Sequence, residues 1–258
     1  MISLAGLILS PALLWGWIFY HSHRYKQSHL PLLALLFLGG FGAGMLALVL
    51  NHSVEKYTVF WPGAQQPIEE ILGLAIAIHS AGFWLMVGVN EECAKLAVLL
   101  LAVYPSRHLE EPFDGILYAA VIALGFATVE NAVYLEQYGT TVVISRSLIT
   151  LPAHAFMSVP LGYFTAKSKL SLMGRGKTPN AYHVPMLLIL AGWCYSAMLH
   201  GFYDLLLALN LDHFSYALVV LMMLQGIWFG KKSLKQSKLA PFQAGKDKAA
   251  AEPTTGPS

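Results

Sequence analysis

Long apolar runs separated by short polar segments make up most of the chain. A helix that crosses a membrane needs about 20 mainly apolar residues. Six segments satisfy this requirement directly, at residues 2–20, 30–50, 115–137, 141–166, 184–209 and 213–229. The pattern therefore predicts an all-α protein, a polytopic bundle of membrane-spanning helices.

A seventh region, residues 67–104, is too long for one simple span and short for two. Lysine and arginine occur in residues 21–29, in residues 167–183 and after residue 230, but not in the connections 136–140 and 210–212. If the basic segments are cytoplasmic, the six spans alternate correctly only when residues 67–104 cross an odd number of times. We expect residues 67–80 to form a short helix at the outer interface and residues 82–104 to cross. Two crossings in this region is the alternative.

This solution gives about seven transmembrane helices plus one interfacial helix, with the N-terminus outside and the C-terminus in the cytoplasm. Residues 1–230 then form an integral membrane domain, and residues 51–66 form an outward-facing loop. Residues 231–258 are rich in Lys, Ala, Pro, Gly and Thr, which predicts a basic, disordered cytoplasmic tail. Arg146, near the outer end of its span, is expected to extend toward the lipid headgroups.

Composition agrees with a membrane protein. The chain is 56% hydrophobic and 12% charged, whereas soluble domains are typically about 45–50% apolar and about 25% charged. The net charge of +2 does not indicate nucleic-acid binding. Cys93 and Cys194 lie inside apolar runs without CxxC spacing, so neither a disulfide framework nor a thiolate zinc site is indicated.

Several ionisable residues lie within the predicted spans. Glu91, Glu92 and Lys95 share one span, where each charge is unfavourable by about 2.5–3.5 kcal/mol on insertion scales. At the rise of an α-helix, ionisable residues on four spans lie about 10–20 Å from the outer end of their spans. These four residues are Glu91, Glu130, His154 and His200. We therefore expect these spans to build one active site in the middle to outer half of the bilayer.

Carboxylates and imidazoles at one site allow two mechanisms. Glu and His can hold a metal ion that activates water, or one Glu can act as a general base while His or Asn stabilises the oxyanion. The chain contains no GxSxG, HExxH or GxGD motif, so serine, zincin-type and aspartyl chemistry are not indicated. The sequence does not decide which of Glu91 and Glu92 activates water.

Four short motifs occur in order, each on its own predicted span: EECAK at 91–95, FATVEN at 126–131, PAHAF around His154, and HGFYD at 200–204. Together they resemble the motif set of the PrsW family of intramembrane proteases, which is related to the CAAX prenyl endopeptidases and the Abi proteins. The similarity covers about residues 82–209, which would be the catalytic core. The resemblance implies a multi-pass protease of the cell (inner) membrane. It also implies a membrane-protein substrate, such as an anti-sigma factor, that is cut on the extracytoplasmic side.

The resemblance also implies roles for single residues. Glu91, Glu92, His154 and His200 would be catalytic, and Lys95, Glu130, Asn131 and Asp204 would support them. If a zinc ion is bound, its ligands would come from Glu91, Glu130, His154 and His200. A metal-free glutamate mechanism stays open beside it.

Two other classes of function fit the same residues. Intramembrane Glu, His, Asp and Lys also build proton relays in ion- or proton-coupled transporters. A non-catalytic scaffold or immunity protein on the same fold is the third hypothesis. The Glu92 and Lys95 pair could be a buried ion pair, and Asn131 and Asp204 could form hydrogen bonds between helices.

Overall fold

The computed structural model describes residues 4–23, 29–59, 73–173 and 182–237. These residues are almost entirely helical, and no β-strand occurs among them. The helices are α1 (Leu4–Ser22), α2 (Leu30–Val59), α3 (Gly73–Val98), the π-helix η1 (Leu99–Val103), α4 (Pro112–Tyr138), α5 (Thr140–Leu148), α6 (Thr150–Met157), α7 (Val159–Met173), α8 (His183–Ala208) and α9 (Asp212–Lys235). The predicted all-α membrane bundle is confirmed.

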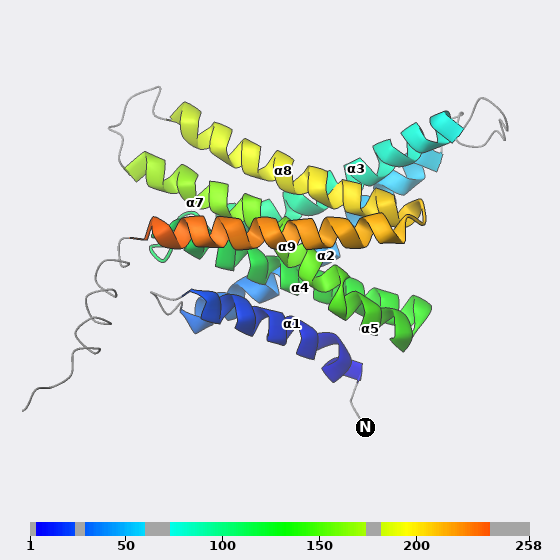
Figure 1. Ribbon diagram of the computed structural model, residues 1–258, viewed down its shortest axis with the longest axis horizontal. Helices are drawn as coiled ribbons and strands as arrows, with labels where there is room; N and C mark the ends of the chain where they lie inside the picture. Colours follow the sequence, from blue (N-terminus) through cyan, green and yellow to red (C-terminus); the bar gives the residue numbers. More distant parts are fainter. Residues whose placement is uncertain (1–3, 24–28, 60–72, 174–181, 238–258) are drawn as a thin grey trace, which may run out of the picture.

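Helix α4 is the central element of the bundle (Figure 1). It begins at Pro112, a residue well suited to a first helical position, and Asp114 Oδ2 accepts a hydrogen bond of 2.9 Å from the Glu111 backbone N–H. Of its most apolar 18 residues, 83% are buried inside the protein, compared with 11% for α1. Helix α4 therefore gives the other helices a common packing surface.

Small residues let neighbouring backbones approach α4 closely. A Cβ atom added at Gly125 would collide with the carbonyl oxygen of Phe37 on α2, and one at Gly115 would collide with that of Gly162 on α7. Glycine at helix contacts is characteristic of membrane bundles, where backbone packing replaces the hydrophobic driving force. These contacts fix the position of α4 relative to α2 and α7.

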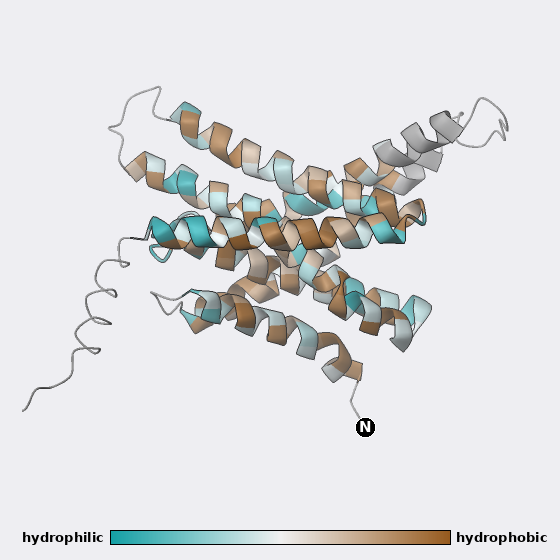
Figure 2. Ribbon diagram, viewed as in Figure 1, coloured by the Kyte–Doolittle hydropathy of each residue, from teal (hydrophilic) through white to brown (hydrophobic). Residues whose placement is uncertain are grey.

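Six helical segments of the described residues are long and apolar enough to cross a membrane. They are Leu4–Ser22, Leu30–Val54, Pro112–Tyr138, Thr140–Met173, His183–Ala208 and Asp212–Lys235. Many apolar side chains point outward, such as Leu101 and Leu148, which are 80% and 72% exposed. Figure 2 shows the matching pattern on α9, which is apolar along its middle and hydrophilic at its ends. The outer surface is thus suited to lipid.

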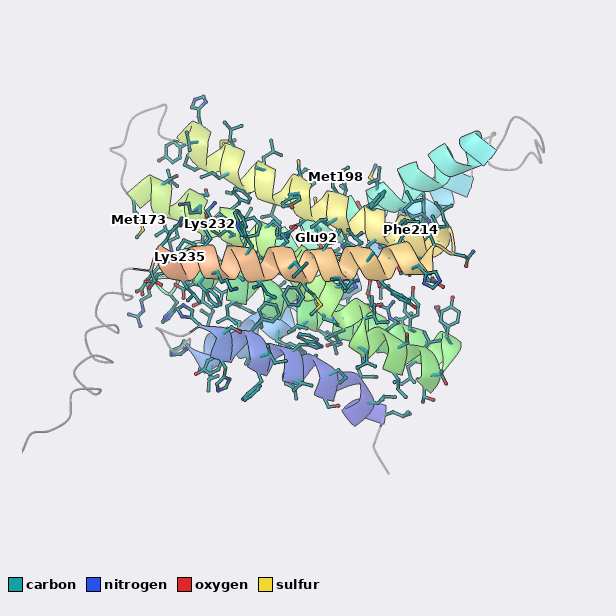
Figure 3. All side chains as sticks on the ribbon, viewed as in Figure 1. Glu92, Met173, Met198, Phe214, Lys232 and Lys235 are labelled. Carbon is teal, nitrogen blue, oxygen red and sulfur yellow. The ribbon has the colours of Figure 1, made fainter. Side chains whose placement is uncertain are left out.

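Helix α3 carries three ionisable residues, Glu91, Glu92 and Lys95, which are unfavourable within a membrane. It nevertheless packs closely against α8 and α2, and Figure 3 shows Glu92 near the middle of the bundle's length. Its three charges are therefore enclosed by other helices.

Three boundaries differ from the sequence-based expectation. Helix α3 begins at Gly73 and passes through residue 82 without a break, so residues 73–80 are not a separate interfacial helix; residues 67–72 lie outside the described part. Helix α2 continues beyond its apolar run to Val59, so the loop predicted to begin at Asn51 does not begin there. The polar residues 51–59 extend a helix that hydropathy alone had ended at Leu50. Helix α9 runs to Lys235, so the tail predicted to begin at residue 231 does not begin there; from residue 238 the predicted tail lies outside the described residues.

Candidate active site

Helix α6, which carries His154, is a short segment within a broken span. The stretch from Thr140 to Met173 is interrupted at Ile149 and Ser158. Pro152 and Pro160 lack the N–H that would bond to the carbonyl four residues earlier, and proline bends or breaks a helix for this reason. The prolines thus account for both breaks, and His154 lies on the eight-residue helix between them.

Glu92 is the most enclosed carboxylate of the site, with no exposed surface. Its Oε1 atom accepts hydrogen bonds from Lys95 Nζ at 2.6 Å and from His200 Nδ1 at 2.9 Å. Its Oε2 atom accepts a hydrogen bond from Ser158 Oγ at 3.3 Å. Because a carboxylate paired with an ammonium can only accept hydrogen bonds, His200 carries a proton on Nδ1, and its Nε2 is the unprotonated nitrogen whenever the ring is neutral. Glu92 therefore fixes the orientation and tautomer of His200.

Glu91 points in another direction, toward α2 and a cavity. Its Oε1 atom accepts a hydrogen bond of 2.9 Å from Asn51 Nδ2, and its Oε2 atom lies 3.1 Å from His200 Nε2. Asn90 donates to Asn51 Oδ1 at 3.3 Å, which orients the Asn51 amide. Asp204, one turn after His200 on α8, lies 3.6 Å from the same Nε2 atom. Nε2 of His200 is therefore faced by two carboxylates.

His154 belongs to a second set of contacts. Its Nε2 atom lies 2.9 Å from Glu130 Oε2, which also accepts a hydrogen bond of 2.8 Å from Arg146 Nη2. Arg146 Nε donates to Asn131 Oδ1 at 3.0 Å. The other ring nitrogen, Nδ1, lies 3.5 Å from Lys95 Nζ, and the rings of His154 and His200 are 4.9 Å apart. Lys95 and the two histidines join the two sets into one cluster.

A cavity of about 530 Å³ opens onto this cluster. This volume is within the usual range for ligand pockets of about 300–1,000 Å³. The cavity has a polar part and an apolar part. The polar part includes Asn51, Glu91, Glu130, Arg146, His154 and Asp204. The apolar part includes Leu48, Phe83, Trp84, Val87, Val133 and Leu207. Such a cavity can accept a polypeptide segment with apolar side chains and bring its backbone to ionisable groups.

Comparison with known proteins identifies the family. A family model described as "PrsW family intramembrane metalloprotease" matches residues 28–228, more than three quarters of the chain. The chain belongs to the PrsW family.

Three curated relatives named Protease PrsW illustrate the similarity. The relative from Geobacillus kaustophilus is 29% identical over 238 residues, covering 92% of this chain and 93% of its own. The one from Shouchella clausii is 29% identical over 237 residues, covering 90% and 98%. The one from Bacillus subtilis is 31% identical over 151 residues, covering 58% and 64%. No solved structure matches the chain.

Membership in the PrsW family confirms the resemblance seen in the four motifs, and it makes the chain a multi-pass membrane protease. The match begins at residue 28 and ends at residue 228, so it extends beyond the predicted catalytic core of residues 82–209 in both directions. It includes α2, which contributes Asn51 to the cavity.

The donor atoms of the PrsW site fit a metal ion. Glu91, His154 and His200 are buried, and one potential ligand atom from each lies within 4.8 Å of the others. Glu91 Oε2 receives no hydrogen bond from the described residues, although His200 Nε2 is 3.1 Å away. When His200 is neutral, both atoms bear lone pairs, and their separation resembles that of neighbouring ligands of a tetrahedral zinc ion, which are about 3.3 Å apart when each bond is about 2.0–2.1 Å. Glu130 is 2.9 Å from His154 but is not part of this group of three.

One further feature favours a divalent cation. Each histidine has a carboxylate on one ring nitrogen, Glu92 for His200 and Glu130 for His154, as is usual for metal-ligating histidines. Charge balance is compatible with such a cation. Among the described residues, the four carboxylates of Glu91, Glu92, Glu130 and Asp204 face two side-chain cations, so the other two negative charges are balanced either by protonation of both histidines or by a divalent cation. These two cations are Lys95 and Arg146.

The structure brings all eight residues named from the sequence into one cluster. It separates Glu91, which lines the cavity, from Glu92, which does not. It adds Asn51 and Arg146, which the sequence analysis had assigned to a loop and to the headgroup region. For Arg146 the prediction was wrong, because its side chain is only 11% exposed. The spacing in the sequence could have placed Arg146 at the site. Arg146, Thr150 and His154 follow one another at intervals of four residues, and all three line the cavity.

Proposed function

We propose that this protein is an intramembrane endopeptidase that hydrolyses a peptide bond of a membrane-protein substrate in the cavity between α2, α3, α4, α6 and α8. The observation that carries this proposal is the convergence of Glu91, His154 and His200 within 4.8 Å beside that cavity. These groups come from three helices that are distant in sequence, and burying them there is unfavourable unless they have a function. The family assignment favours proteolysis over the transporter and scaffold hypotheses.

The residues divide into three roles in this proposal. Glu91, His154 and His200 would hold a zinc ion, which when bound would supply an activated water and polarise the scissile carbonyl. Glu92 and Lys95 do not reach the cavity, and they hold His200 in its ligating tautomer. Asp204 takes the proton from water, because Glu91 is a ligand, Glu92 is sealed, and Glu130 is already paired with Arg146.

The metal-free mechanism uses the same geometry differently. Glu91 would be the general base for water, held by Asn51 through its other oxygen, and His200 would stabilise the oxyanion. The description of the matching family as metalloproteases favours the metal-dependent form.

The arrangement of charges supports an orientation in the cell membrane. Helices α7 and α9 both end on the side of the bundle opposite the N-terminus (Figures 1 and 3). The lysines near these two helix ends are Lys167 and Lys169 on α7, and Lys231, Lys232 and Lys235 on α9. The positive-inside rule makes this end cytoplasmic. The N-terminus is then outside and the C-terminus inside.

This orientation constrains the substrate. The cavity includes Gln137 and Leu207, next to the connections between α4 and α5 and between α8 and α9, at the extracytoplasmic end. The scissile bond would therefore lie in the outer half of the bilayer. A single-pass regulatory protein such as an anti-sigma factor, cut near the outer end of its span, is the substrate class that we propose.

The proposal is tested with purified protein in liposomes and a tagged single-pass membrane substrate. Glu91→Gln and His200→Ala should abolish cleavage, whereas Glu136→Gln, which changes an exposed glutamate on α4, should leave it unchanged. Zinc content is measured on the same preparations. Bound zinc in the wild type that is lost in Glu91→Gln supports the ligand role.

The outcomes separate the alternatives. Cleavage by metal-free wild type, abolished by Glu91→Gln, would establish the glutamate mechanism instead. Full cleavage by both Glu91→Gln and His200→Ala would refute the proposed site.

A further inference from the structure

Arg146 has a set of contacts that the four sequence motifs do not explain. It lies on α5, one turn before the break at Ile149 that separates α5 from α6. Its Nη2 atom is 2.8 Å from Glu130 Oε2 and its Nε atom is 3.0 Å from Asn131 Oδ1, both on α4. Its guanidinium carbon lies 3.8 Å from the centre of the Tyr134 ring, one turn further along α4. The guanidinium is thus held on three sides by one helix.

These contacts connect Arg146 to His154 through a single oxygen atom. Glu130 Oε2 accepts the hydrogen bond from Arg146 and lies 2.9 Å from His154 Nε2. Without the arginine, the Glu130 carboxylate, which is 15% exposed, would be free to rotate toward the cavity. The arginine thus restricts the position of the atom that orients the histidine.

The position of Arg146 on the chain adds to this effect. Helix α6 is bounded by two breaks, so its orientation depends on what fixes each end. The end after α6 is fixed by Ser158, which donates to Glu92. The end before it is fixed by the hydrogen bond from Arg146 to Glu130 of α4 and by Thr150, whose hydroxyl is 3.0 Å from that of Tyr203 on α8.

We propose that Arg146 is a positioning residue of the protease: it holds Glu130 so that His154 stays aligned, and it fixes α5 to α4 at the break before α6. This inference rests on the proposed function only for the role of His154. Lysine could not replace it, because its single ammonium is a point charge, whereas the planar guanidinium contacts Glu130, Asn131 and Tyr134 together.

The test compares Arg146→Ala and Arg146→Lys with Arg107→Ala, a change of an exposed arginine between η1 and α4. Outer-shell partners of this kind typically change activity or metal affinity by about 10- to 100-fold. We expect kcat for cleavage to fall by about this factor in Arg146→Ala, with little change in KM, and to recover only in part in Arg146→Lys. Zinc affinity, measured by chelator competition without substrate, should fall as well, and Arg107→Ala should match the wild type.

Chemical rescue provides a second readout. Since Arg146 lines the cavity, added guanidinium can enter the space left in Arg146→Ala and should restore part of kcat. Guanidinium should not restore the kcat of Glu91→Gln, because that variant lacks a carboxylate and not a guanidinium. A purely structural arginine would lower the yield of folded protein but leave kcat per folded molecule unchanged.

Wild-type kcat in folded Arg146→Ala, or full activity in Arg146→Lys with no effect of guanidinium on the alanine variant, would overturn the inference. If Arg146→Ala does not fold, the kcat and zinc affinity of Arg146→Lys decide. The proposed function fails separately, through full activity of Glu91→Gln and His200→Ala. If wild type binds no zinc, the kcat and rescue measurements still test Arg146.

Discussion

Replacing Lys95 by Met should destabilise the protein through Glu92. The two side chains form an ion pair of 2.6 Å with 1% and 0% of their surfaces exposed. At an effective dielectric constant of about 20, two unit charges at this distance attract by about 6 kcal/mol. Methionine retains the apolar stem of lysine beside Phe126 but leaves the buried carboxylate without its cation.

The net loss is smaller than this attraction, because Glu92 keeps its contacts with His200 and Ser158. Removing one partner of a buried ion pair usually destabilises by about 3–5 kcal/mol, and we expect about 3 kcal/mol here. The free energy of unfolding can be measured by SDS titration in mixed micelles, followed by circular dichroism.

The double variant Glu92→Gln/Lys95→Met is the decisive control. Removing both charges should recover most of the stability lost in Lys95→Met, because no unpaired buried charge is left. Equal stability of Lys95→Met and wild type would refute the reasoning. So would a double variant as unstable as the sum of the two single changes.

Two further predictions concern packing and the end of α6. Gly125→Ala should destabilise the protein by about 1–3 kcal/mol, because the added Cβ would collide with the Phe37 carbonyl. Gly42→Ala is the control and should leave stability unchanged, because nothing lies within 4 Å of its added atom. Thermal unfolding of the two variants and the wild type measures the difference. Ser158→Ala removes one of three hydrogen bonds to Glu92 and should lower stability by about 1 kcal/mol while cleavage continues at a reduced kcat, as a liposome assay would show. A Ser158→Ala variant that cleaves at the wild-type rate with wild-type stability would contradict this role.

The membrane architecture and much of the candidate site could be predicted from the sequence. Apolar runs of span length give the helices, and charges within those runs are unfavourable enough to indicate which residues meet. The same reasoning placed Glu91, Glu130, His154 and His200 at similar depths, and the structure brings them together.

Hydropathy did not locate Asn51 and Arg146, which also line the cavity. It ends α2 where polar residues begin, but the helix continues, so Asn51 was placed in a loop. Depth along a helix does not show which way a side chain points, so Arg146 was assigned to the headgroups although it faces α4. The different roles of Glu91 and Glu92 could not be predicted from the sequence either. Adjacent residues point about 100° apart on a helix, and only the packing of α8 decides which of the two glutamates faces His200 Nδ1.

The contacts of Glu92 are synthesised at different times. Lys95 follows it by three residues, but Ser158 and His200 follow by 66 and 108 residues. When α3 enters the membrane it therefore has only one of these three partners, an ammonium one turn away on the same helix. This local ion pair offsets two of the three charges of the segment before α6 and α8 exist. The lysine that orders the finished site thus also helps its helix to be inserted during biosynthesis.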